Sequence, residues 1–163
     1  MKLTVIGASR GIGRKVVDYA LERGHEVRAV ARSADSMDIA SDRFEAIAGD
    51  AADPELLSRA VSGADTVILT LGVPRDIRVL RPTTLFSSVT QALIPAMQDA
   101  GVRRLLTVTS FGAGDSHAKL STPEKITMKL FLGRAYEDKA LQEDLIRGSD
   151  LDWTIARPGI LTD

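Results

Sequence analysis

A glycine-rich segment near the amino terminus has the residue types and spacing of a phosphate-binding turn. Residues 7–13 read Gly-Ala-Ser-Arg-Gly-Ile-Gly and directly follow a β-branched apolar run at residues 2–6. Apolar residues then repeat at helical spacing as far as Gly24, so the segment would join a strand to the amino end of a helix. Backbone N–H groups and the positive end of the helix dipole at such a junction bind anionic groups. The segment therefore predicts a dinucleotide pyrophosphate site in the first βαβ unit.

Each of the three glycines in this segment has a separate expected role. Gly7 lets the chain turn tightly, Gly11 lets backbone approach a pyrophosphate, and Gly13 lets the helix pack closely on the strand. A tight turn without a ligand is the alternative, although each glycine costs about 0.5–1 kcal/mol of backbone entropy that a plain turn would not require. The cofactor-binding residues expected here are Gly7, Ala8, Ser9, Arg10, Gly11, Ile12 and Gly13.

The end of the second predicted strand indicates which dinucleotide would bind. An NAD site usually places an acidic residue about 20 positions after the glycines, where it binds the ribose hydroxyls. Here Arg32 follows Gly13 by 19 positions, and Arg10 in the glycine segment can approach the same side. Two guanidinium groups would suit a 2′-phosphate, because they supply charge and paired donors. The sequence thus predicts NADP(H) in preference to NAD(H), with two solvated arginines as the alternative.

Strand-like and helix-like segments alternate along the whole chain. Asp53-Pro54-Glu55 is a typical helix start, with aspartate as the N-cap and proline as the first helical residue. The strands are nearly all apolar, which is typical of a parallel sheet covered by helices on both faces. We therefore expect a doubly wound α/β sheet of the Rossmann type with about six strands. The expected strands are residues 2–6, 25–31, 44–48, 66–71, 102–109 and 151–156; the expected helices begin at residues 12, 55 and 83, with a long helical region from a capping box at 121–124 to Gly148.

The composition is that of one ordinary globular domain. The 163 residues are 44% hydrophobic and 26% charged, with 21 basic against 22 acidic side chains. This balance argues against a general nucleic-acid or membrane surface, and the apolar run at 67–73 is far too short to span a bilayer. There is no cysteine, and the isolated His25 and His117 do not indicate a metal site. A strand-like run begins at once, so we expect a cytoplasmic domain without a signal peptide or bound metal.

Further short motifs follow the predicted strands in a fixed order. Gly49-Asp50-Ala51 follows the third strand, Leu71-Gly72 the fourth and Val108-Thr109-Ser110 the fifth. Lys139 and Glu143 lie in the long helical region, and residues 151–159 read Leu-Asp-Trp-Thr-Ile-Ala-Arg-Pro-Gly. With the glycine segment, this set resembles the atypical NAD(P)H-binding branch of the short-chain dehydrogenase/reductase superfamily. That branch includes NmrA-like proteins and biliverdin reductase B/flavin reductase-like enzymes, and the resemblance covers essentially the whole chain.

The resemblance implies where a nicotinamide cofactor would lie. The positions concerned are at the carboxyl ends of strands or on the adjoining helix, where open α/β sheets bind ligands. On the adenosine side, the resemblance implies Asp50 and Ala51 at the adenine, and Leu71 and Gly72 along the adenosine and ribose. On the nicotinamide side, it implies Lys139 at the ribose and Pro158 near the nicotinamide. Thr109 and Ser110 follow the fifth strand, and Ser110 would face the nicotinamide or substrate. Two alternatives stay open, because Asp50 could instead start a turn and Ser110 could be a turn residue only.

The chain departs from the family pattern at the catalytic acid. Conventional members carry Tyr-x-x-x-Lys, in which the lysine lowers the tyrosine pKa so that the tyrosine donates a proton. Lys139 matches the lysine, but Ala135 stands four residues before it and Tyr136 only three. One helical step turns a side chain by roughly 100°, so we expect Tyr136 to point beside the nicotinamide cleft as a packing residue. The catalytic candidates are Ser110 and Lys139, with Tyr136 added despite this expectation.

The displaced tyrosine favours one kind of chemistry. Reduction of a simple carbonyl needs a proton delivered with the hydride, whereas a flavin-like or quinone-like acceptor forms a delocalised anion that solvent can protonate. The leading interpretation is an NADP(H)-dependent oxidoreductase with such an acceptor, to which Phe111 could offer an aromatic surface unless it belongs to the core. Two alternatives stay open: an NmrA-like regulator that senses the dinucleotide without turnover and signals to a protein partner, and a carbonyl-reducing or epimerase-like enzyme.

Two expectations concern the carboxyl-terminal part of the chain. The charges between residues 134 and 147 include the i,i+4 pairs Arg134/Asp138 and Glu143/Arg147, which we interpret as a solvated helix face. Relatives with this motif set continue for some dozens of residues past Arg-Pro-Gly at 157–159. The resemblance therefore implies a single NAD(P)-binding domain, 1–163, that lacks the C-terminal substrate-side elements.

Overall fold

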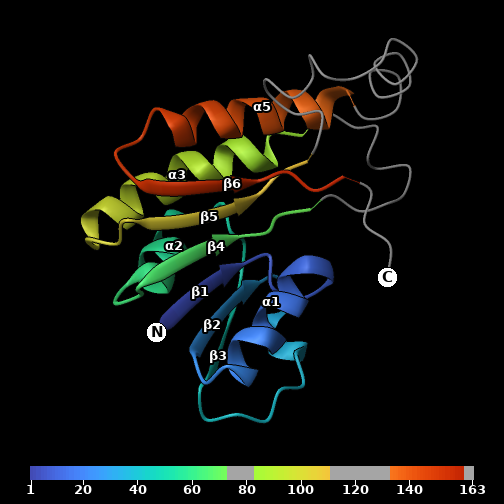
Figure 1. The fold of residues 1–163 in the computed structure, drawn as a ribbon, viewed down its shortest axis with the longest axis vertical. Coiled ribbons are helices and arrows are strands. Elements are labelled where there is room, and N and C mark those ends of the chain that lie inside the picture. The colour runs from blue at the N-terminus through green and yellow to red at the C-terminus, as the bar shows by residue number, and fades with distance from the viewer. Residues whose placement is uncertain (73–82, 111–132, 160–163) are drawn as a thin grey trace.

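Six parallel strands form one sheet, in the order β3-β2-β1-β4-β5-β6 (Figure 1). The computed structural model describes residues 1–72, 83–110 and 133–159. The strands are β1 (Lys2–Ile6), β2 (Glu26–Ala31), β3 (Phe44–Ala48), β4 (Thr66–Leu69), β5 (Arg104–Val108) and β6 (Asp152–Ala156). The helices are α1 (Gly11–Glu22), α2 (Pro54–Val61), α3 (Leu85–Asp99) and α5 (Gly133–Arg147), with a 3-10 turn η1 (Ala34–Ser36). The predicted doubly wound fold is confirmed.

Two apolar clusters show that helices cover both faces of the sheet. On one face, Val17 and Ala20 of α1 pack against residues of β1 and β2. On the other face, α2, α3 and α5 pack against β1, β2, β4 and β5, with Leu57, Leu93 and Ile146 fully buried. The chain crosses between the faces where the strand order reverses, between β1 and β4. In doubly wound sheets this reversal opens a crevice at the carboxyl ends of the strands.

Helix α2 begins as the sequence predicts. The side chain of Asp53 accepts a hydrogen bond from the backbone N–H of Glu55 at 2.9 Å, and Pro54 is the first helical residue. This bond satisfies one of the N–H groups that have no partner within the helix. The start of α2 is therefore fixed locally, on the loop that follows β3.

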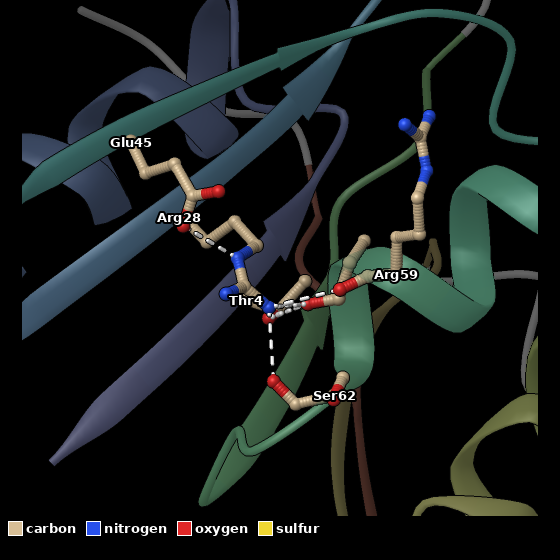
Figure 2. A network of polar contacts seen from close by, with 6 residues as sticks. Thr4, Arg28, Glu45, Arg59 and Ser62 are labelled. Atoms are coloured by element: carbon tan, nitrogen blue, oxygen red, sulfur yellow. Dashed lines mark hydrogen bonds and ion pairs between the residues drawn. The ribbon is translucent and has the colours of Figure 1, made fainter.

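A buried arginine fixes the other end of α2 to the sheet (Figure 2). Arg28 lies in β2, opposite Thr4 of β1 and Glu45 of β3. The Nε of Arg28 donates to a carboxylate oxygen of Glu45 at 2.8 Å. The hydroxyl of Thr4 donates to the backbone oxygen of Ala60, at the carboxyl end of α2. A cation stabilises carbonyls that carry the negative end of a helix dipole. The arginine donates to the backbone oxygens of Arg59 at 3.1 Å, Ala60 at 2.7 Å and Ser62 at 3.0 Å.

Several residues considered in the sequence lie outside the described part of the chain. They are Phe111, His117 and the capping box at 121–124. Within the described residues, no helix has the length and apolar character needed to cross a membrane.

Candidate functional site

The glycine turn between β1 and α1 is held closely against the neighbouring strand ends. The N–H of Gly7 donates to the carbonyl of Val30 at 2.9 Å, and Gly7 has a φ of +86°. A Cβ at Gly7 would lie 2.7 Å from the carbonyl oxygen of Thr70, and one at Gly13 would lie 2.2 Å from the carbonyl oxygen of Gly7. No side chain fits at either distance. Gly13 therefore allows the close approach of α1 to the first turn, and Gly7 allows that turn to lie against the end of β4.

Gly11 is a glycine for a different reason. It is the first residue of α1, is exposed and has a φ of +55°, yet a Cβ there would meet no protein atom within 4 Å. The side chain of the N-cap residue Arg10 makes no capping bond to the helix. Helix N–H groups without a capping side chain are available to an anion. The space beside Gly11 is therefore open at the point where the sequence places a pyrophosphate.

The remaining residues of the turn divide between core and surface. Ala8 is fully buried, and its N–H reaches the carbonyl of Val30 at 3.3 Å. Ser9 and Ile12 are half-buried, while Arg10 and Arg32 are both exposed. Because the turn bonds to Val30, it lies next to the end of β2, two residues before Arg32. The topology thus places both arginines at the same sheet edge.

The ends of β3 and β4 provide the predicted adenosine-side residues. Asp50 is exposed, and one of its carboxylate oxygens accepts from the N–H of Ala52 at 3.0 Å. The turn that was the alternative for Asp50 is therefore present, and the second carboxylate oxygen has no partner among the described hydrogen bonds. Ala51 and Leu71 are half-buried against the core. Gly72 is exposed, with nothing within 4 Å of a Cβ.

Three side chains meet after β5. The ammonium of Lys139 on α5 donates to the hydroxyl of Ser110 at 2.8 Å and to the carbonyl of Thr109 at 3.2 Å. It also lies 4.9 Å from the centroid of the Phe86 ring. The side chain of Ser110 in turn forms a hydrogen bond with Tyr136. The structure thus brings all three catalytic candidates together.

Tyr136 was expected to lie beside the nicotinamide cleft as a packing residue, and the structure places it half-buried on α5 with a side-chain hydrogen bond to Ser110. Residues three apart on a helix share a face, as residues four apart do. Tyr136 lies three residues before Lys139 and Ala135 lies four before it. Both residues are therefore on the side of α5 that carries Lys139. Ala135 is buried, and Tyr136 is the residue whose hydroxyl approaches Ser110. A Tyr-x-x-Lys spacing is thus able to place the phenol beside the serine.

Burial changes the protonation of the two titratable groups in this cluster. Desolvation lowers the pKa of Lys139 from 10.5 to about 8, and the negative charge of Glu143 opposes this shift. Desolvation raises the pKa of Tyr136 above 10, and the hydrogen bond from Ser110 opposes that shift. At neutral pH the lysine is therefore mainly an ammonium and the tyrosine a neutral phenol. Lys139 donates to the hydroxyl of Ser110, which is also hydrogen-bonded to Tyr136.

The interpretation of 134–147 as a solvated face is wrong for two of its acidic residues. Asp138 is 3% exposed, and its carboxylate accepts from the N–H of Phe86 at 2.8 Å and from the hydroxyl of Ser87. These donors lie in the first turn of α3, where a carboxylate also meets the positive end of the helix dipole. Asp138 therefore caps α3 from the neighbouring helix. The side chain of Arg134 lies outside the described residues.

Glu143 is the second buried acid. Its carboxylate accepts from the hydroxyl of Thr109 at 2.7 Å and from Nε of Arg157 at 3.0 Å, and Arg157 reaches the second oxygen as well. The expected pair with Arg147 is present at 3.8 Å, but on a carboxylate whose side chain is 1% exposed. The sequence predicts the pair with Arg147 but not the pair with Arg157. The pairing of Glu143 with an arginine beyond the sixth strand is visible only once the strand order is known.

Two of the predicted cofactor residues, Thr109 and Pro158, lie next to the contacts of Glu143 or take part in them. The hydroxyl of Thr109 is engaged by Glu143, and its carbonyl accepts from Lys139. Pro158 is half-buried directly after Arg157, at the carboxyl end of β6. Of the two residues after β5, Thr109 offers Lys139 its carbonyl and Ser110 its hydroxyl. In the part of the chain that the structure describes, no group of three His, Asp or Glu side chains is placed to hold a metal ion.

Sequence comparison finds a family match over nearly all of the chain. Residues 7–163 match the model of a family described as NAD(P)H-binding. The protein YwnB of Bacillus subtilis (strain 168) is 28% identical over 174 residues, which cover 100% of this chain and 74% of YwnB. The chain therefore spans about three quarters of this relative.

Solved structures agree with this match. ChuY of Escherichia coli O157:H7, described as an anaerobillin reductase, has a TM-score of 0.80 and 28% identity, covering 100% of this chain and 75% of ChuY. A short-chain dehydrogenase/reductase of Veillonella parvula DSM 2008 in complex with NADP has a TM-score of 0.79 and covers 96% of this chain and 68% of its own. At 19% identity this second likeness supports the fold alone.

Proposed function

The chain belongs to the NAD(P)H-binding family, and from this we propose that it transfers a hydride from NADPH to an extended conjugated acceptor of the flavin, quinone or bilin type. The predicted resemblance to atypical short-chain dehydrogenases/reductases is confirmed, as is the prediction of an NAD(P)H-dependent oxidoreductase. The preference for NADP(H) and the class of acceptor are the proposal.

The described residues fit a dinucleotide. The open space beside Gly11 and the N–H groups at the start of α1 suit the pyrophosphate. The exposed Arg10 and Arg32, at one sheet edge, suit a 2′-phosphate. The bound nucleotide would supply the hydride, and Lys139 and Ser110 would supply donors on the side of the nicotinamide ribose.

The observation that carries the acceptor class is the protonation of Tyr136. Its pKa is raised by burial, so the phenol gives up its proton reluctantly. A general acid works best when its pKa lies near the working pH. A conjugated acceptor delocalises the charge brought by hydride, and solvent can complete its protonation. Tyr136 would therefore orient such an acceptor together with Ser110, and ChuY, which is 28% identical, is described as an anaerobillin reductase.

Loss of nicotinamide absorbance tests this proposal. The protein would be incubated with NADPH and, separately, with FMN, a soluble quinone, a bilin and a simple aldehyde. We expect oxidation of NADPH with at least one conjugated acceptor and none with the aldehyde. Reduction of the aldehyde alone would contradict the acceptor class. Nucleotide binding without turnover across the panel would instead favour the dinucleotide-sensing regulator.

A further inference from the structure

One buried carboxylate joins α5 to both strand ends of the candidate site. Glu143 accepts from the hydroxyl of Thr109, directly after β5, and from the guanidinium of Arg157, directly after β6. It also faces Arg147 on its own helix. Residues Ser110 and Pro158, which the family resemblance places at the nicotinamide, immediately follow the two residues that it binds. A change at Glu143 would therefore alter the spacing of both strand ends.

The same carboxylate is the negative charge that acts on Lys139. Glu143 stands one helical turn after the lysine, and its charge opposes the effect of burial on the lysine pKa. Burying an ammonium without an opposite charge is unfavourable, and its proton is then lost more readily. The charge of Glu143 thus favours the ammonium form of Lys139.

Among the described residues, few other groups could balance the positive charge of Lys139. From α3, Lys139 meets the uncharged Phe86 ring, and from β5 it meets Ser110 and a carbonyl. Asp138, the adjacent acid on α5, is committed to the first turn of α3. Tyr136 is a neutral phenol on the far side of Ser110, and β6 contributes the positive charge of Arg157.

We propose that Glu143 is a positioning residue, which holds the carboxyl ends of β5 and β6 in register with α5 and balances the charge of Lys139, one helical turn before it, where the lysine donates to Ser110. The inference rests on the proposed function, because it assigns Glu143 a part in presenting Lys139 to the nucleotide. The protonation of Lys139 can nevertheless be measured without nucleotide or acceptor. Failure of this inference and failure of the proposed reaction are therefore distinguishable.

Chemical labelling of Lys139 tests the proposal. The rate of acetylation of its amine, followed against pH by mass spectrometry of the peptide, reports the fraction that is deprotonated. In Glu143→Gln we expect the midpoint to move down by about one pH unit, as is typical when a nearby opposite charge is lost. Glu137→Gln is the matched control, because Glu137 is exposed on the same helix. Glu143→Asp, which keeps the charge, should restore most of the midpoint.

A second variant keeps the test decisive if Glu143→Gln does not fold. Arg157→Gln removes positive charge and leaves the carboxylate, so the Lys139 midpoint should move up, in the opposite direction. A purely structural role for Glu143 would lower the melting temperature of both variants without these opposed shifts. Unchanged midpoints, or shifts of the same sign, in whichever variants fold would overturn the proposal.

Discussion

Ser110 after β5 lies beside Lys139 and Tyr136 of α5, and burial determines the protonation of the two titratable groups. Lys139, Ser110 and Tyr136 form one chain of hydrogen bonds. Burial acts on both titratable groups and disfavours the charged form of each. It lowers the pKa of the lysine and raises the pKa of the tyrosine. The site at neutral pH therefore contains an ammonium, a hydroxyl and a neutral phenol.

The first prediction concerns the phenol. Tyr136→Phe should lower kcat with a conjugated acceptor by less than about tenfold, because an acid that supplies the reaction proton is typically worth 10²–10⁴-fold. Steady-state rates at pH 7 measure this. A loss of a hundredfold or more would make Tyr136 the catalytic acid and contradict the role proposed for it.

The second prediction concerns pH. As the pH rises through about 8, Lys139 loses its proton, so its attraction for the anionic nucleotide should fall. NADPH affinity, measured by fluorescence titration between pH 7 and 9.5, should therefore decrease in the wild type. Lys139→Met should bind more weakly at pH 7 and show a nearly flat profile. An equally steep decrease in Lys139→Met would assign the titration to another group.

The third prediction concerns nucleotide choice. Arg32→Glu should weaken NADPH binding by about 10–100-fold, the range expected from losing a hydrogen bond to a charged group, and should change NADH binding much less. Arg43→Glu, at an exposed position before β3, is the control for net charge. Equal losses for both nucleotides in Arg32→Glu would refute the 2′-phosphate assignment.

At the scale of elements, α5 organises the carboxyl-terminal half of the sheet. One part of its surface binds α3 through Asp138, and Gln142 donates to Thr90 of α3 at 3.1 Å. Another binds the ends of β5 and β6 through Glu143. Polar contacts on either side of Lys139 thus join α5 to α3 and to the ends of β5 and β6, and the position of Lys139 depends on them.

The fourth prediction tests this anchoring. Asp138→Ala would leave the N–H of Phe86 buried without its acceptor, so the free energy of unfolding should fall by about 1–3 kcal/mol. Denaturant unfolding followed by circular dichroism measures this. Asp144→Ala, at an exposed position on the same helix, should change the stability by much less. Similar losses in the two variants would show that Asp138 does not cap α3.

At the scale of the whole molecule, the sequence was sufficient for the sheet and its order of elements. Three kinds of feature depend only on residues close together in the chain and can therefore be predicted from the sequence. They are the apolar runs, the Asp53-Pro54 helix start and the glycine turn. The strands after the crossover are shorter than predicted: residues 66–71 were expected and β4 is Thr66–Leu69. The chain leaves the sheet there to pass the glycine turn, where Thr70 donates to the carbonyl of Ile6 at 2.9 Å.

The polar supports of the site could not be predicted in the same way. Asp138 and Glu143 have the spacing of surface residues, and their burial depends on partners at Phe86, Thr109 and Arg157, far away in the chain. Arg28 is another example, since an arginine inside an apolar strand has a partner only once α2 is placed. The contact between Tyr136 and Ser110 likewise depends on how α5 lies against the end of β5, which the sequence does not show.

The protein is proposed to transfer a hydride from NADPH to a conjugated acceptor. A single-turnover experiment under anaerobic conditions tests it directly, with NADPH or NADPH deuterated at the transferred position mixed with the protein and the best acceptor of the panel. We predict that nicotinamide absorbance and acceptor absorbance change together, one nucleotide for each two-electron reduction, and more slowly with deuterium. Nucleotide that binds without any loss of nicotinamide absorbance would contradict the account.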